Sequence, residues 1–277
     1  MFLTTICNNF ITERIEAYLK TYSEQQALVS QMNLMDDMFF HKVAEHPEAC
    51  QEMLRIILKK PDLCVKQCQT QRYLRNLDAH SVILDVLCTD ESGRMFNIEI
   101  QKKDDDAHQR RVRFNISNVD TTFVEKGIPY KNFPDVCVVF ISAFDLFEMD
   151  KTLYHVRRVV DGTDKYVENG THEVYVNAAV DDGSEIAELM QYFINSTGYH
   201  ENFKTVCKQV DYYKKSNEGV TVMSDVIEEY VLKRTKEDQI NAAKNMFKEG
   251  LSVELIARIF PSLSSEILLQ LQKNISV

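Results

Sequence analysis

The feature that most constrains this chain is a pair of strand-like runs, residues 82–89 and 94–101, joined by a short polar turn. Both runs are rich in β-branched and aromatic residues, and the sequence DESG between them (residues 90–93) is typical of a turn. A three-residue loop with its glycine in the left-handed conformation would then set the register. In that register Asp85 lies opposite Glu99, with Cβ atoms about 4.5–5.5 Å apart. The sequence therefore predicts a β-hairpin that carries two facing carboxylates.

Two facing carboxylates repel each other, and partial burial disfavours the charged form of each. Gln101 follows Glu99 by two residues and projects from the same face of the strand. A hard divalent ion such as Mg²⁺ prefers oxygen ligands and would relieve the repulsion. Two simpler alternatives stay open: an arginine pairs with Glu99 or Asp85, or the register slips and one carboxylate faces solvent.

The same residues resemble the signature of a known superfamily. Asp85, followed after the turn by Glu99-Ile-Gln101, resembles the D…E-x-K/Q motif of PD-(D/E)XK nucleases, and more narrowly of their Rpn (recombination-promoting nuclease, transposase-like) family. The resemblance extends from about residue 33 to about 147. A lone D…E-x-Q is a weak signal, whereas an ordered set of segments is specific. The set is LMDDMFFHKV, LDVLCTDESGRMFNIEIQ, RRVRFNISNVDTTFVEKGIPY and PDVCVVFISAF.

This resemblance implies an α/β fold, a restriction-endonuclease-like α/β/α core with a mixed central sheet. It also implies metal-dependent hydrolysis of DNA phosphodiester bonds with little sequence preference, in recombination or in defence against mobile elements. Asp85 and Glu99 would hold the ion, Mg²⁺ first with Mn²⁺ or Ca²⁺ as alternatives. Gln101 stands where many relatives have Lys, and Lys103 could supply the missing charge if the strand continues.

A helix expected over residues 35–45 carries another candidate acid. Asp36 and Asp37 lie at its start, where acidic residues also simply oppose the positive end of the helix dipole. In the family, an acid at this place lies near the active site. Asp37 fits that pattern best, and Asp36 is its competitor.

A second helix, expected over residues 108–126, carries the candidate DNA contacts. Arg110, Arg111 and Arg113 cluster in its N-terminal half. They either form a solvated face or contact the phosphate backbone of DNA, and Arg111 is the favoured contact.

The chain is expected to contain three parts: a helical extension (1–30), a nuclease-like domain (31–195) and a C-terminal helical region (196–277). Within the domain, a helix followed by the apolar run 136–142 predicts a crossover to a parallel strand. The last region reads as short helices of helix-turn-helix type. Its final helix lacks Lys and Arg until Lys273, which favours assembly into a homo-oligomer over base reading.

Composition narrows the class of protein further. The 277 residues carry a formal charge of −10, which counts against tight, sequence-independent coating of DNA. Seven scattered cysteines form no zinc spacing, and we expect reduced thiols in a cytoplasmic protein without membrane spans. Two rival functions stay open: a catalytically silent, nuclease-fold interaction protein, and a DNA-binding transposase accessory factor.

Overall fold

The chain divides into two compact units. The structure is a computed structural model that describes residues 22–74, 82–104, 107–124 and 126–275. The first unit, here called the sheet unit, comprises the described residues between 31 and 213; the second, the helical unit, comprises the described residues 22–30 and 214–275. Residues 196–213, expected in the C-terminal region, belong to the sheet unit. The helix that begins at Lys204 packs on the sheet unit, because the backbone N–H of Val206 donates to the Glu52 carboxylate at 2.8 Å and Val210 is fully buried.

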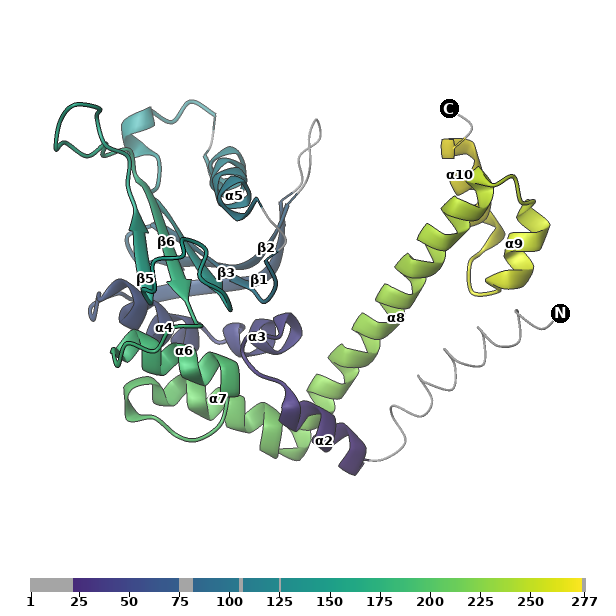
Figure 1. The fold of residues 1–277 in the computed structure, drawn as a ribbon, viewed down its shortest axis with the longest axis horizontal. Coiled ribbons are helices and arrows are strands. Elements are labelled where there is room, and N and C mark those ends of the chain that lie inside the picture. The colour runs from purple at the N-terminus through teal and green to yellow at the C-terminus, as the bar shows by residue number, and fades with distance from the viewer. Residues whose placement is uncertain (1–21, 75–81, 105–106, 125, 276–277) are drawn as a thin grey trace. The chain divides into compact units, whose positions relative to one another are not determined.

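The sheet unit is built on one mixed sheet of six strands (Figure 1). The strand order is β1-β2-β3-β4-β6-β5. The strands are β1 (Val65–Leu74), β2 (Val82–Asp90), β3 (Met95–Gln101), β4 (Val136–Ser142), β5 (Leu153–Val156) and β6 (Thr171–Asn177). β3 pairs with β4, and β4 with β6, in parallel, whereas the remaining neighbours are antiparallel.

The parallel pairing of β3 and β4 confirms the crossover expected from the sequence. The connection contains α5 (His108–Phe123), which ends before the expected Lys126. Every residue of β4 is buried, as its continuous apolar run predicts for a strand covered on both faces. The apolar side of α5 packs on the sheet through Val112, Ile116 and Val119. The helix thus covers one face of the sheet beside the β2–β3 hairpin.

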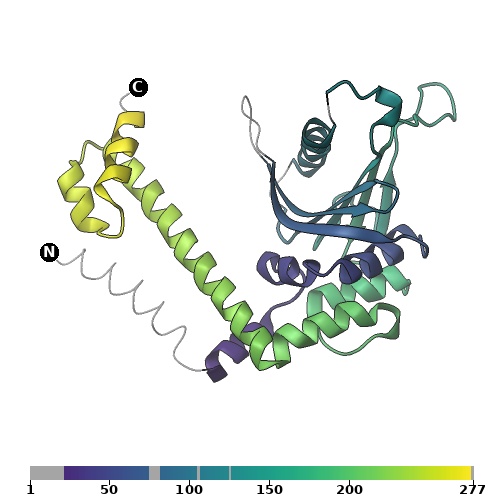
Figure 2. The ribbon, with the colours of Figure 1, turned by 180° about the vertical axis from the view of Figure 1, so that it is seen from behind.

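The other face of the sheet is covered by helices from both ends of the sheet unit (Figure 2). α3 (Asp37–Ala44) lies against β1 and β2, and α4 (Pro47–Leu58) lies against β1. α6 (Glu185–Asn195) packs on α4, and α7 (Lys204–Lys215) lies beyond these helices, away from the sheet. Short 3₁₀ turns occur at Tyr130–Asn132, in the connection between α5 and β4, and at Glu201–Phe203. α4 begins with Pro47 at its first turn, where a missing backbone N–H costs nothing. This arrangement of helix, mixed sheet and helix is the α/β/α core that was expected.

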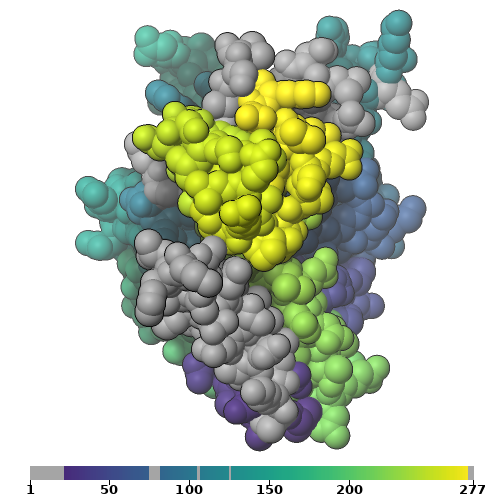
Figure 3. All heavy atoms as spheres, turned by 90° about the vertical axis from the view of Figure 1, so that its right-hand side faces the viewer, coloured from purple at the N-terminus to yellow at the C-terminus, as the bar shows by residue number. Residues whose placement is uncertain are grey.

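The helical unit differs in part from expectation. Its described helices are α2 (Tyr22–Gln31), α8 (Asn217–Lys248), α9 (Val253–Ile259) and α10 (Ser265–Ile275). The segment NAAKNMFK is the end of the 32-residue α8 and not a separate short helix, because nothing breaks the helix before Gly250. A small core of Phe247, Ile256, Leu263 and Leu268 joins the end of α8 to α9 and α10. Figure 3 shows the outer surface of this part of the chain in yellow-green and yellow. Among the described residues, no helix combines the length and the apolar character that crossing a membrane requires.

Candidate active site

The turn between β2 and β3 sets the register of the hairpin. Oδ1 of Asp90 accepts hydrogen bonds from the backbone N–H groups of Ser92 and Arg94, both at 2.9 Å. Gly93 adopts φ +83°, the left-handed conformation that the three-residue loop requires. The strand pairs then run from Thr89 opposite Met95 to Val86 opposite Ile98, in the predicted register.

Asp85 and Glu99 come next in this register, and there the side chains bond across the hairpin. The backbone N–H of Asp85 donates to Oε1 of Glu99 at 3.3 Å, and the backbone N–H of Ile100 donates to Oδ2 of Asp85 at 3.0 Å. Each carboxylate therefore has one oxygen fixed by the backbone of the opposite strand. Such bonds orient both side chains without using their second oxygens.

The second oxygen of each carboxylate faces a group that can carry positive charge. Oε2 of Glu99 lies 3.5 Å from Nη2 of Arg111 on α5, and Oδ1 of Asp85 lies 3.8 Å from Nε2 of His41 on α3. Glu99 is only 3% exposed. Burial first, and then the charge of Asp85, raise the pKa of Glu99 to about 8, although the Arg111 guanidinium opposes the shift.

The two carboxylates line a cavity of ≈ 440 Å³ between the hairpin, α3 and α5. Six residues expected at the site lie around it: Asp37, Asp85, Glu99, Gln101, Lys103 and Arg111. Lys103 lines the cavity even though β3 ends at Gln101. The Gln101 amide nitrogen donates to the backbone oxygen of Lys103 at 2.7 Å, which holds these two residues together beyond the end of the strand.

Two of the three arginines expected to contact DNA lie outside the carboxylate cavity. Arg110 and Arg113 are exposed on α5, and neither is among the described residues that line the cavity. A helix turns about 100° per residue, so only one of these near neighbours can face the hairpin. Arg111 takes that position, and Asn115, one turn further along α5, lines the cavity with it.

The two candidate acids of α3 differ in their surroundings. Asp37 lines the cavity, and burial together with the charge of Asp85 raises its pKa. Asp36 instead forms an ion pair with Lys102, with Oδ1 2.7 Å from Nζ, and accepts a hydrogen bond from the backbone N–H of Asn33. Asp37 therefore shares the electrostatic field of the carboxylate pair, whereas the Asp36 side chain is engaged by Lys102 and Asn33 and makes no capping bond to α3.

His41 and Gln71 were missed by the sequence analysis. Nδ1 of His41 lies 3.1 Å from Nε2 of Gln71, and Gln71 has φ +48°, a left-handed conformation uncommon for a residue other than glycine. With Nδ1 accepting from the Gln71 amide, a neutral His41 carries its proton on Nε2, toward Asp85. The signal that could have found His41 is its spacing of four residues from Asp37, which places both on one side of α3.

The donor set of this cavity fits a divalent cation. Asp85 and Glu99 present carboxylate oxygens, the ligands that Mg²⁺ and Ca²⁺ prefer. The raised pKa of Glu99 has repulsion from Asp85 among its causes, and a cation would remove that cause. The contacts of 3.5 and 3.8 Å to Arg111 and His41 are loose enough for an ion to replace them.

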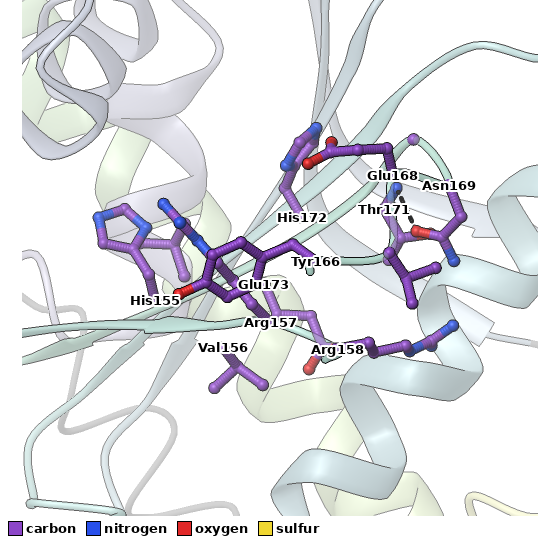
Figure 4. Close-up of a pocket in the computed structure, with 13 residues that line it drawn as sticks. His155, Val156, Arg157, Arg158, Tyr166, Glu168, Asn169, Thr171, His172 and Glu173 are labelled. Carbon is purple, nitrogen blue, oxygen red and sulfur yellow. Dashed lines mark hydrogen bonds between the residues drawn. The ribbon is translucent and has the colours of Figure 1, made fainter. Parts of the chain in front are cut away.

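A second cavity, of ≈ 250 Å³, lies at the β5–β6 hairpin and has a different character (Figure 4). Its lining mixes cationic and acidic side chains, among them Arg157, His172 and Glu168. The guanidinium of Arg157 lies 5.0 Å from the ring centroid of Tyr166, so its charge is already engaged by an aromatic face. This cavity holds no pair of carboxylates fixed by strand pairing, and it offers no comparable chemistry.

Comparison with known proteins gives one match. Residues 48–175 match the model of a family described as PD-(D/E)XK nuclease family transposase. The matched segment contains β1 to β4, α5 and the whole carboxylate hairpin, while α3 with Asp37 and His41 precedes it. Neither a curated protein nor a solved structure matches the chain.

Proposed function

Because residues 48–175 match the model of the PD-(D/E)XK nuclease family transposases, we propose that this chain is a metal-dependent endonuclease that hydrolyses phosphodiester bonds of DNA. The observation that carries the proposal is the pair Asp85 and Glu99, fixed by reciprocal hydrogen bonds across the hairpin and lining a cavity. Little sequence preference in cleavage is proposed by analogy with the family alone. Recombination or defence against mobile elements is the proposed setting.

Asp85 and Glu99 would hold the ion, with Mg²⁺ as first choice and Mn²⁺ or Ca²⁺ as alternatives. When bound, the ion polarises a phosphate oxygen and lowers the pKa of a bound water. The two carboxylates are suited to this task because their orientation is set by backbone hydrogen bonds and does not depend on the ion. His41, facing Asp85, is a positioning residue for that carboxylate.

Three further residues of the cavity have proposed roles around the pair. Asp37 adds a third carboxylate, which can accept a proton from water because its pKa is raised. Gln101 is neutral, and its carbonyl oxygen can orient a water by accepting a hydrogen bond. Lys103 supplies a positive charge on the same side of the cavity, where developing negative charge on the phosphate needs stabilisation.

The proposed DNA contact is Arg111, supported by Arg110 and Arg113. Arg111 lies beside Glu99 in the cavity and would turn to a phosphate when a cation takes over the charge of Glu99. Arg110 and Arg113 are exposed on the same helix and would contact the backbone on either side of the scissile bond. A local cluster of this kind is compatible with a net charge of −10.

The test is cleavage of supercoiled plasmid in Mg²⁺, Mn²⁺, Ca²⁺ or EDTA. We expect cation-dependent nicking by the wild type and its loss in Asp85→Asn and Glu99→Gln, with circular dichroism unchanged. Glu91→Gln is the matched control, because Glu91 is an exposed acid in the turn of the same hairpin. Cleavage that persists in both site variants, or that persists in EDTA, would overturn the proposal.

A second candidate function rests on the helical unit and on Gln101. Leu255 on α9 is 45% exposed and Leu269 on α10 is 50% exposed, which favours a protein contact at this unit. With Gln in place of Lys, the fold would then serve as a silent scaffold that assembles as a homo-oligomer, or as a DNA-binding accessory factor. Light scattering of the wild type and of Leu269→Glu tests the assembly, and absence of cleavage in every cation would favour this function.

A further inference from the structure

Three cysteines that are far apart in sequence meet at one edge of the sheet unit. Cys50 comes from α4, Cys68 from β1 and Cys88 from β2. Cys68 and Cys88 are opposed in the β1–β2 ladder, and their Sγ atoms lie 3.0 Å apart. The Sγ atom of Cys50 completes the group, and all three sulfurs lie within 4.8 Å of one another. This thiol cluster is separate from the carboxylate cavity, which none of the three residues lines.

Burial of the thiol cluster is uneven in a way that suits a ligand. Cys50 and Cys88 are fully buried, whereas Cys68 is partly exposed. Buried cysteines usually behave as small apolar residues, spread among aliphatic neighbours. Here they face each other instead, and Cys50 Sγ also donates a weak hydrogen bond to the backbone oxygen of Ala44 at 3.3 Å. The partly exposed Cys68 provides the route by which an ion can reach the two buried sulfurs.

The spacing of the sulfurs agrees with a shared metal ion. Metal–thiolate bonds of about 2.3 Å place the sulfurs of one ion roughly 3.8 Å apart. The three sulfurs of the cluster span this value, from 3.0 Å to at most 4.8 Å. Sulfur ligands reject hard ions such as Mg²⁺ and Ca²⁺ and select soft or borderline ones.

We propose that Cys50, Cys68 and Cys88 form a binding site for one thiolate-preferring metal ion, Cu⁺ or Zn²⁺. Cu⁺ would be held by the three sulfurs alone, while Zn²⁺ would add a water on the exposed side of Cys68 as its fourth ligand. Binding replaces the thiol protons, which are released to solvent. The ion would fasten α4 to the β1–β2 hairpin, and β2 also carries Asp85.

A disulfide is the rival use of the same residues. Cys68 and Cys88 are directly opposed, but 3.0 Å between their sulfurs is longer than the bonded distance of about 2.05 Å. A disulfide would also leave Cys50 without a role. The metal site uses all three sulfurs, and the two alternatives differ in a measurable way, because a disulfide removes two of the metal ligands.

The experiment is native mass spectrometry of the full chain, reduced, stripped of metal and then given Zn²⁺ or Cu⁺ under anaerobic conditions. We expect one ion per chain, with affinity lowered at least about 100-fold in Cys68→Ser and Cys88→Ser. Cys137→Ser is the matched control for a buried strand cysteine, and Cys64→Ser for a partly exposed one near β1. Both controls should bind as the wild type does.

A second measurement on the wild type keeps the proposal testable if a variant fails to fold. Alkylation of Cys68 by N-ethylmaleimide, followed by peptide mass spectrometry, should slow at least about 10-fold when Zn²⁺ or Cu⁺ is present, and should not change with Mg²⁺. Absence of stoichiometric binding, binding that survives in Cys68→Ser, or a Cys68–Cys88 disulfide in the purified protein would each overturn the proposal.

Discussion

The carboxylate cavity and the thiol cluster are two sites of opposite chemistry that share strand β2. The cavity presents oxygen ligands from a single hairpin, with Asp85 and Glu99 held by backbone hydrogen bonds. The thiol cluster presents sulfur ligands from three elements, α4, β1 and β2. Asp85 and Cys88 stand three residues apart on one strand. Under the two proposals, one strand contributes to a hard-cation site and to a soft-cation site, because the chemistry of the side chains selects the ion.

The largest expected effect is that variants of each site lose the property of that site and keep the property of the other. Asp85→Asn and Glu99→Gln should reduce plasmid cleavage on the order of 10²–10³-fold, as removal of a preorganised electrostatic group does, and should leave the binding of one Zn²⁺ or Cu⁺ per chain intact. Cys68→Ser should lose the soft ion and retain most of the cleavage. Cleavage rates and metal stoichiometry measured on the same preparations check this. A variant that loses both properties while still folded would show that the two sites are not independent.

Arg111 tests whether the cavity binds the substrate phosphate. Arg111→Gln should lower cleavage by roughly 10²-fold because it removes both the phosphate contact and the charge beside Glu99. Arg113→Gln is the matched control on the exposed part of the same helix, and its effect should be several-fold and confined to DNA affinity. Single-turnover cleavage with fluorescence anisotropy of bound DNA separates the two effects. Equal losses in both variants would argue against a special role for Arg111.

His41 tests whether orientation of Asp85 matters for metal affinity. His41→Ala should lower the affinity for the metal ion about 10–100-fold, as loss of a group that orients a metal ligand commonly does. The affinity is measured as the cation concentration that gives half-maximal cleavage. Because the carboxylate itself remains, high Mn²⁺ should restore most of the rate. Gln71→Ala should have a smaller effect of the same kind, since Gln71 acts through His41. A loss that no cation concentration restores would instead place His41 in the chemistry.

The contrast between the two sites also explains what the sequence could predict. The turn chemistry of residues 90–93 fixed the hairpin register, so the approach of Asp85 and Glu99 followed from local rules alone. The parallel β3–β4 pair followed from one apolar run after one helix. These predictions succeeded because each depends on residues close together in the chain.

The missed residues depend on contacts between distant elements. Cys50, Cys68 and Cys88 show no metal spacing in the sequence, because α4 must first pack on β1 and β2 before their sulfurs meet. His41 reaches Asp85 only after α3 docks beside the hairpin. The left-handed conformation at position 71 could not be predicted either, because the residue there is glutamine and not glycine. Likewise, the sequence analysis treated NAAKNMFK as a short helix of its own, whereas it continues α8, whose 32 residues run without a break to Lys248.

Glu99 provides the finest test of the cavity, because its protonation links stability to pH. Its pKa of about 8 lies above the ordinary value of 4.5, so between these values the folded protein holds a proton that the unfolded chain has released. The free energy of unfolding should therefore fall as pH rises from about 5 to 8, by at most about 1.4 kcal/mol per pH unit from this group. Glu99→Gln removes this contribution, so the melting temperature of the variant minus that of the wild type should increase with pH.

A divalent ion replaces the proton on the wild-type carboxylate and should stabilise the wild type more at pH 8 than at pH 6, with no such trend in the variant. The thiol cluster predicts no response to Mg²⁺ at either pH, so a Mg²⁺-dependent shift that survives in Glu99→Gln would place the hard-ion site outside the hairpin.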